Sequence, residues 1–195
     1  MAMLENLSKY RLVLASNSPR RRSLLAGLDI DFEVRVIKGI DESYPEDIDV
    51  SDISLYIAKS KAEAYKPTIA DDELIITADT VVIASGKVLG KPSSHDEAFE
   101  MLRSLSSIEH KVVTGVCMMT KDKFSSFKSE SYVRFASLED EEITYYLDKY
   151  KPYDKAGAYG IQEWIGYIGV QAINGSFYNV MGLPVQRLYQ ELRRF

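Results

Sequence analysis

Three arginines stand side by side early in the chain, at Arg20, Arg21 and Arg22. They follow Ser18 and Pro19, a pair typical of the first turn of a helix. A helix N-terminus attracts anions through its unpaired backbone N–H groups, and cations placed there weaken the helix unless an anion offsets them. The pattern therefore fits a phosphate-binding turn, and it fits a solvated basic turn equally well.

An aspartate and a lysine occupy positions where charge is costly. Asp79 interrupts the apolar run from Ile75 to Ile83, so it needs a cation, a metal ion or hydrogen-bond donors. Such a carboxylate is either a structural ion pair or, beside a phosphate site, a general base or a Mg²⁺ ligand. Lys61 follows Ile57 by four residues, which places it on the apolar side of a predicted helix. Its ammonium group either extends back to water or points into a cleft.

Three loops carry further candidates. Lys91 follows a predicted strand and precedes Pro92, a position where loops often present functional groups. Glu42 lies in an acidic loop that is either solvated or helps to hold a divalent cation. The segment from Gly157 to Gln162 combines small residues, a tyrosine and an amide, which are the parts of a nucleobase pocket and equally of a glycine-rich connection.

The elements that must position these residues alternate at first between strand and helix, while adjacent strands follow in the middle of the chain. Ser51 is predicted to cap one helix, and Ser94 with Glu97 forms a predicted capping box. Asn174 and Gly175 predict a hairpin turn. We expect α/β architecture with a mixed, twisted sheet flanked by helices, two lobes around a central cleft, and one domain over residues 1–195. The predicted strands are 11–16, 32–36, 73–84, 87–89, 112–119 and 132–136, and residues 123–131 are predicted to be extended. The predicted helices are 19–28, 51–65, 95–105, 140–150 and one that begins at Pro184 and includes Leu192.

Composition excludes several classes of protein. The chain has 24 Lys and Arg against 29 Asp and Glu, a net charge of −5, which argues against a surface built to coat nucleic acid or anionic lipid. Cys117 is the single cysteine, so a disulfide framework is excluded and a reducing compartment is favoured. The most apolar stretch, Leu74 to Ala84, is too short to span a membrane and contains a charge. We expect a soluble, cytoplasmic protein with neither a membrane nor a stable nucleic-acid partner.

Five motifs in order resemble the Maf family of nucleoside triphosphate pyrophosphatases, over almost the whole chain from Arg11. The resemblance is closest to the branch that hydrolyses dTTP and UTP to the nucleoside monophosphate and pyrophosphate. It implies a hydrolase with an inosine-triphosphatase-like fold that forms a homodimer. It also implies a house-cleaning role against non-standard nucleotides. The motifs are LASNSPRR from Leu14, ADTVV from Ala78, GKP from Gly90, TGV from Thr114 and DKAGAYGIQ from Asp154.

The resemblance also implies roles for individual residues. Asp79 matches the proton acceptor that activates water, and Glu42 with Asp79 matches the acidic positions for a divalent cation, Mg²⁺ first and Mn²⁺ as the alternative. The positions that govern substrate choice are Arg20, Thr80 and Gln162, and the positions that line the triphosphate cleft are Ser16, Arg21, Lys61 and Lys91. One departure stands out, because Glu163 replaces the glycine that usually follows the glutamine.

Two other functions stay open at this stage. One is a pyrophosphatase for modified purine nucleotides, and the other is a regulator of cell division that binds nucleotides without chemistry. A panel of nucleoside triphosphates separates the three functions, since only a dTTP/UTP pyrophosphatase releases pyrophosphate from dTTP and UTP.

Overall fold

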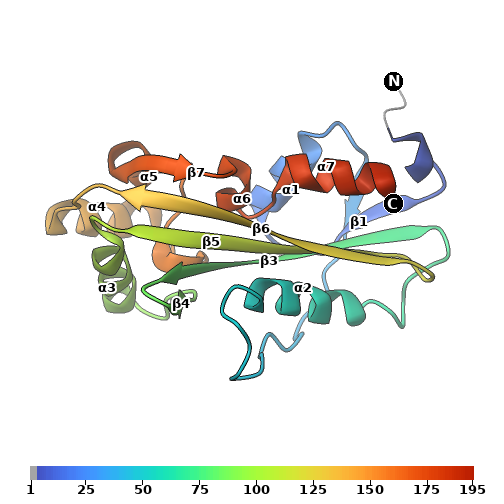
Figure 1. Ribbon diagram of the computed structural model, residues 1–195, viewed down its shortest axis with the longest axis horizontal. Helices are drawn as coiled ribbons and strands as arrows, with labels where there is room; N and C mark the ends of the chain where they lie inside the picture. The colour runs from blue at the N-terminus through green and yellow to red at the C-terminus, as the bar shows by residue number, and fades with distance from the viewer. Residues whose placement is uncertain (1–3) are drawn as a thin grey trace. The chain divides into compact units, whose positions relative to one another are not determined.

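The computed structural model describes residues 4–195. Its strands form a mixed sheet in the order β2-β1-β3-β5-β6-β7, with β4 paired to β3, and helices flank it (Figure 1). β1 is parallel to β2 and β3, whereas β4 and β7 are antiparallel to β3 and β6. The predicted α/β class is confirmed, and the predicted central cleft stays a prediction. The strands are β1 (Arg11–Leu14), β2 (Phe32–Val34), β3 (Glu73–Ala84), β4 (Lys87–Leu89), β5 (Glu109–Met119), β6 (Phe124–Phe135) and β7 (Val170–Asn174).

The chain forms two compact units. Unit 1 contains the described residues up to Asp79 together with Thr114–Ser129 and Gly182–Phe195, and unit 2 contains Thr80–Val113 and Glu130–Met181. The single domain expected over residues 1–195 stays a prediction, and residues 1–3 lie outside the described part. No helix within residues 4–195 has the length and apolar character needed to cross a membrane. The helices are η1 (Glu5–Leu7), α1 (Pro19–Ala26), α2 (Ile53–Glu63), α3 (His95–Leu105), α4 (Asp140–Tyr150), η2 (Ala156–Ala158), α5 (Trp164–Gly169), α6 (Phe177–Met181) and α7 (Val185–Arg194).

In unit 1, α2 lies on one face of the strands, and α1 and α7 lie on the other (Figure 1). The Thr77 hydroxyl on β3 donates a hydrogen bond to the Ala58 carbonyl of α2 at 2.7 Å. A Cβ at Gly115 of β5 would lie 2.4 Å from the backbone of Leu55, so only glycine permits this approach of α2. Apolar side chains fill the space between helix and sheet, among them Val13, Ile75, Ala58, Ala62, Tyr65 and Cys117.

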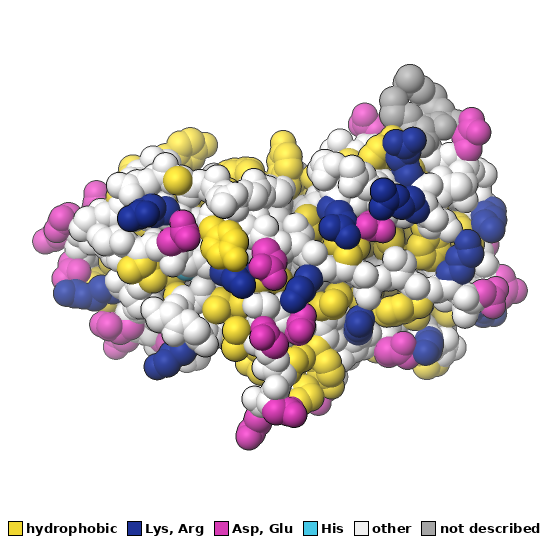
Figure 2. All heavy atoms as spheres, viewed as in Figure 1, with side chains coloured by type: hydrophobic (Ala, Val, Ile, Leu, Met, Phe, Trp, Pro, Cys, Tyr) yellow, Lys and Arg dark blue, Asp and Glu magenta, His cyan; other side chains and the backbone are white. Residues whose placement is uncertain are grey.

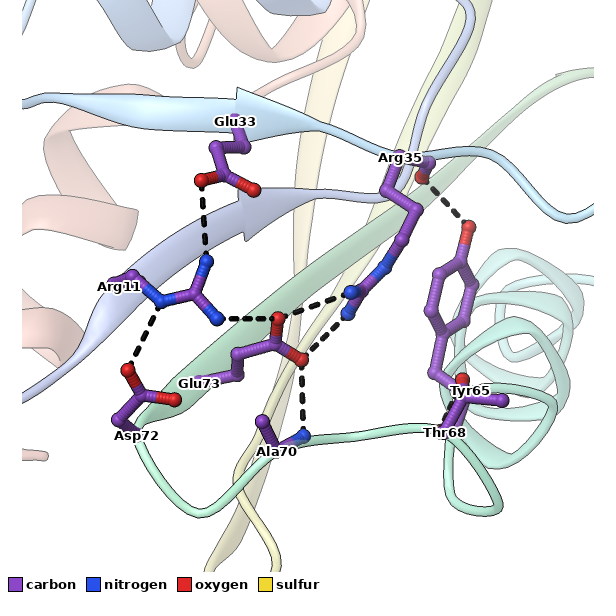
Figure 3. A network of polar contacts seen from close by, with 8 residues as sticks. All are labelled: Arg11, Glu33, Arg35, Tyr65, Thr68, Ala70, Asp72 and Glu73. Carbon is purple, nitrogen blue, oxygen red and sulfur yellow. Dashed lines mark hydrogen bonds and ion pairs between the residues drawn. The ribbon is translucent and has the colours of Figure 1, made fainter.

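A buried carboxylate fixes the start of β3 (Figure 3). Glu73 is 2% exposed and binds Arg35 through both of its oxygens, at 3.0 and 2.6 Å. Arg11 of β1 and the backbone N–H of Ala70 bind the same carboxylate at 3.1 and 3.0 Å. The Tyr65 hydroxyl in turn donates to the Arg35 carbonyl at 2.8 Å. The Arg35 hydrogen bonds hold the pKa of Glu73 below its usual value, so charge pairing aligns the amino ends of β1 and β3.

In unit 2, α3 and α4 pack together over the strands. Ser85 and Gly86, the two residues between the predicted strands 73–84 and 87–89, form the turn from β3 to β4, and both have positive φ, 49° and 75°. α4 spans the predicted residues 140–150 and buries Ile143, Tyr146 and Leu147. These side chains join one core with α3 and the strands, which includes Leu102, Leu105, Val133, Phe135 and Ile165.

The predicted hairpin turn at Asn174 and Gly175 was wrong. β7 ends at Asn174, and the chain continues through Gly175 into α6 instead of a second strand. Gly175 has φ 126°, and a Cβ there would lie 2.6 Å from the Ser131 hydroxyl oxygen. This glycine therefore serves a close approach to β6.

Two predicted caps differ in detail. α2 begins at Ile53 after Asp52, so the predicted cap at Ser51 was wrong. The Tyr56 N–H donates to the Asp52 carbonyl at 2.9 Å, so Asp52 is the N-cap, and the Lys128 ammonium binds the Ser51 carbonyl at 3.2 Å and the Asp52 carboxylate at 2.5 Å. Ser94 does cap α3, accepting from the Glu97 N–H at 3.1 Å. The Glu97 carboxylate completes no capping box, because it binds the residue before Ser94.

Candidate active site

The turn from β1 into α1 has the expected geometry. Pro19 begins the helix, and the Ser18 hydroxyl accepts from the N–H of Arg21 at 3.4 Å. The buried Ser16 hydroxyl accepts from the N–H of Ser18 at 3.2 Å. Because the Ala15 N–H donates to the Ile76 carbonyl at 2.8 Å, this turn leaves the sheet beside β3. The carboxyl ends of parallel strands next to a helix N-terminus are a common place for anionic ligands.

Arg21 ties this turn to its surroundings. Its Nη1 donates to the carbonyl of Ala78, the residue before Asp79, and its Nε donates to the Gly182 carbonyl, each at 2.8 Å. Burial lowers the pKa of Arg21, the charge of Arg20 lowers it further, and the Asp79 carboxylate opposes both. Arg20 itself is half-buried in the first turn of α1. The two arginines therefore concentrate positive charge close to Asp79.

Asp79 meets its cation in Lys61. The Lys61 ammonium lies 2.8 Å from Asp79 Oδ1 and 2.9 Å from Glu42 Oε1. The side chains of Lys61 and Asp79 are each 14% exposed, whereas that of Glu42 is 49% exposed. The pairing explains how an apolar strand accommodates a carboxylate, because a charge-assisted hydrogen bond compensates for lost hydration.

The strand pleat and the helix period position this pair. Ile75, Thr77 and Asp79 alternate along β3 and so share the face on which α2 packs. On α2, Lys61 follows the buried Ile57 by one helical turn, which directs it toward the same face. The sequence indicated a partner for Asp79 and placed Lys61 on the apolar side of its helix, and the structure pairs the two.

The donor set suits a hard divalent cation. Glu42 and Asp79 both direct a carboxylate oxygen at the Lys61 ammonium, so a positive charge is favoured at this point. Mg²⁺ typically takes one or two carboxylates and completes its shell with water and substrate phosphates. Among residues 4–195, no group of three or more His, Cys, Asp or Glu side chains could hold a metal ion by itself. Glu42 and Asp79 supply the one or two carboxylates that Mg²⁺ typically takes, so the residues present fit such an ion.

The remaining candidates belong to unit 2. Thr80 is half-buried on β3 and, by the pleat, points to the opposite face from Asp79. Lys91 is exposed after β4, and the carbonyl of neighbouring Gly90 accepts from the Gly157 N–H at 3.0 Å. That bond joins the loop of Lys91 to the segment that carries Gln162. The pairing of Lys61 with Glu42 and Asp79 is a contact within unit 1, so a joint role for these residues and the unit 2 candidates stays a prediction.

The sequence-based prediction of the site missed three side chains that bind one another beside the turn of Gln162. They are Tyr146, Lys155 and Glu163, of which only Glu163 stands out in the sequence, as a departure from the family motif. Lys155 is 8% exposed and binds Glu163 at 3.1 Å. A lysine within a segment rich in glycine and alanine was the available signal, since a buried ammonium needs a carboxylate.

The amino-acid sequence is similar to those of known proteins over nearly its whole length. The sequence profile described as Maf-like protein matches residues 11–195. A protein of Parabacteroides distasonis named dTTP/UTP pyrophosphatase is 73% identical over 193 residues, covering 99% of this chain and 100% of its own. Proteins of the same name from Bacteroides thetaiotaomicron and Porphyromonas gingivalis are each 57% identical. The first match covers 98% of this chain and 100% of the relative, and the second covers 99% of this chain and 98% of the relative. The chain therefore belongs to the Maf-like protein family.

Proposed function

We propose that this protein is a nucleoside triphosphate pyrophosphatase that hydrolyses dTTP and UTP to the nucleoside monophosphate and pyrophosphate. The observation that carries the proposal is the Asp79 carboxylate bound by Lys61 beside the turn of Arg20 and Arg21. A base surrounded by fixed cations is what attack of water on a polyanion requires. The whole-length relatives named dTTP/UTP pyrophosphatase support the same activity.

The proposed reaction is a displacement at the α-phosphorus. A water oxygen forms a bond to that phosphorus, the bond to the bridging oxygen breaks, and pyrophosphate leaves. One Asp79 oxygen accepts the proton of the attacking water, while Lys61 holds the other oxygen and fixes the carboxylate in place. Arg20, Arg21 and Lys91 contribute positive charge that stabilises the phosphate oxygens, and Ser16 adds a hydroxyl at the same turn.

A divalent cation is part of the proposal. Glu42 and Asp79 would hold Mg²⁺, with Mn²⁺ as the alternative, and the cation would supply charge neutralisation for the phosphate oxygens. Lys61 would then share the two carboxylates with the cation and keep them oriented. We assign choice of the base to Arg20, Thr80 and Gln162, whose donors and acceptors can pair with a pyrimidine edge.

The setting of the enzyme is also proposed. The single cysteine, Cys117, is buried and free, which supports a reducing compartment such as the cytoplasm. Acidic and basic side chains are interspersed on the face shown in Figure 2, which supports a small nucleotide as the ligand over long nucleic acid. We further propose a homodimer with a house-cleaning role against non-standard nucleotides.

A nucleotide panel with Mg²⁺, scored for pyrophosphate, tests the proposal. We expect release from dTTP and UTP, and a loss of about 10²- to 10⁴-fold in Asp79→Asn because the proton acceptor is gone. Asp96→Asn is the matched control, since this side chain is fully exposed on α3. No pyrophosphate from dTTP or UTP, or wild-type turnover in Asp79→Asn, would refute it. Turnover of modified purine nucleotides alone, or binding without turnover, would favour the other two functions.

A further inference from the structure

A tight turn in unit 2 carries Gln162. It is closed by a hydrogen bond from the Glu163 N–H to the Gly160 carbonyl at 2.9 Å. Ile161 and Gln162 occupy its two central positions. The conformation of this turn therefore decides where the Gln162 amide points.

One hydroxyl group binds both ends of the turn. Tyr146 Oη accepts from the Gly160 N–H at 3.0 Å and donates to the carboxylate of Glu163. Tyr146 is fully buried in the core between α4 and the strands, so its ring cannot shift without disturbing that core. Burial, together with the Glu163 bond, raises the pKa of Tyr146, so the hydroxyl remains a donor.

A second contact holds the carboxylate from the other side. The Lys155 ammonium lies 3.1 Å from Glu163 Oε1 and 2.8 Å from Asp154 Oδ1. The side chains of Lys155 and Glu163 are 9% and 20% exposed, so the pair is largely shielded from solvent. Charge-assisted bonds between shielded groups are among the more rigid polar contacts in a protein.

The amide of Gln162 is coupled to this carboxylate by packing. A Cβ at Gly160 would lie 2.8 Å from Glu163 Cδ and 3.0 Å from Gln162 Nε2. Both side chains therefore fold over the glycine. In the described part of the structure, Gln162 Oε1 is buried and has no hydrogen-bond partner. A buried acceptor left in this state is suited to a ligand that brings a donor.

We propose that Tyr146, Lys155 and Glu163, the Tyr146 network, are positioning residues that direct the Gln162 amide and thereby set discrimination between uracil and cytosine nucleotides. The inference rests on the proposed function. Uracil carries a donor at N3, which an amide oxygen can accept, whereas N3 of cytosine is itself an acceptor. A site with an oriented acceptor therefore disfavours cytosine by leaving two acceptors face to face.

The ratio of kcat/KM for UTP to that for CTP tests the network. The two substrates share ribose and triphosphate. Loss of phosphate binding, or of the proton acceptor Asp79, therefore lowers kcat/KM for both substrates together and leaves the ratio unchanged. We expect the ratio to fall by about tenfold in Tyr146→Phe, which keeps the ring and removes both bonds. Glu163→Gln still accepts from the hydroxyl, so its ratio should lie between those of wild type and Glu163→Ala.

Controls separate positioning from folding. Tyr145→Phe alters the neighbouring, 43% exposed tyrosine of the same helix and should leave the ratio at the wild-type value. Gly160→Ala deletes no polar group, but displaces Gln162 or Glu163 and should also lower the ratio, which keeps the test available if Tyr146→Phe fails to fold.

The outcomes are distinguishable. A folded Tyr146→Phe or Gly160→Ala variant with the wild-type ratio would overturn the network while leaving the pyrophosphatase activity intact. An equal loss for UTP and CTP would overturn it as well, since that is the result of a merely structural role. A wild-type protein that hydrolyses neither dTTP nor UTP overturns the proposed function first.

Discussion

Lys61→Met tests the central pair of the candidate site. Methionine keeps an unbranched apolar stem of similar length and removes the ammonium group that binds Asp79 at 2.8 Å and Glu42 at 2.9 Å. Two carboxylates that had converged on one cation are then left facing each other. The variant should therefore be less stable than the wild type and much less active.

The expected magnitude follows from exposure. Removing one partner of a fully buried ion pair costs about 3–5 kcal/mol, and exposed pairs contribute about 0–1 kcal/mol. Lys61 and Asp79 are each 14% exposed, and Glu42 is 49% exposed. We therefore expect the free energy of unfolding to fall by about 2–3 kcal/mol, nearly all of it from Asp79. Loss of the cation that fixes the Asp79 carboxylate should lower kcat/KM for UTP by about 10²- to 10³-fold.

Urea unfolding followed by circular dichroism measures the first effect, and pyrophosphate release measures the second. Lys59→Met is the matched control, because this lysine is exposed on the same helix. The double variant Lys61→Met, Asp79→Asn should regain about 1–2 kcal/mol over Lys61→Met, since no unpaired carboxylate remains in the strand. Stability losses that simply add in the double variant would refute the reasoning.

Three further predictions concern stability. Glu73→Gln should lower the unfolding free energy by about 1–3 kcal/mol at pH 7. The pKa of Glu73 is lowered from 4.5 in the native protein, so the difference from wild type should shrink as pH falls below 4.5 and the native carboxylate becomes protonated. Urea midpoints at pH 7 and pH 3 measure this difference. Burial lowers the pKa of His110 from 6.5 to about 4, so the unfolded chain binds a proton that the native protein does not, and stability should decline as pH falls through this range. His110→Gln, which still offers Tyr159 a hydrogen bond, should flatten that decline in a titration of urea midpoints. Gly115→Ala should cost about 2 kcal/mol or more because its Cβ would lie 2.4 Å from the backbone of α2, whereas Gly90→Ala, where a Cβ meets nothing within 4 Å, should cost little; thermal melting compares the two.

Local chemistry made part of the fold predictable. Ser18 and Pro19 set the start of α1 because a hydroxyl cap and a fixed φ act within one turn of chain. Ser85 and Gly86 set the turn between β3 and β4 because both positions need positive φ. These signals depend on neighbours in sequence, so the sequence alone contains them.

The predictions of local structure were wrong where residues far apart in the sequence determine the conformation. Asn174 and Gly175 have the composition of a hairpin turn, but Gly175 is required by its contact with Ser131 on another strand. Ser51 has a hydroxyl suited to capping, but α2 begins after Asp52, and Lys128, far along the chain, binds both the Ser51 carbonyl and the Asp52 carboxylate. Spacing within a segment does not report such contacts, because they depend on how the strands and helices pack.

The candidate site divides in the same way. The cost of burying charge showed that Asp79 needed a partner, the helix period placed Lys61 on the apolar side of α2, and the arginines at the start of α1 suited an anion. The pairing itself depends on how α2 packs against β3, which no local pattern encodes. Tyr146 was hidden for a further reason, since its ring satisfies the apolar face of α4 and its hydroxyl acts outside that helix.

The path of the chain between its units limits how this protein can be recombined. The backbone passes from one unit to the other between residues 79 and 80, 113 and 114, 129 and 130, and 181 and 182. The first passage lies inside β3, between Asp79 and Thr80. A single crossover between two homologous genes at any one of these points would leave unit 1 assembled from two different parents. Chimeras that exchange a complete unit therefore need all four junctions at once, because neither unit is one continuous segment of the chain.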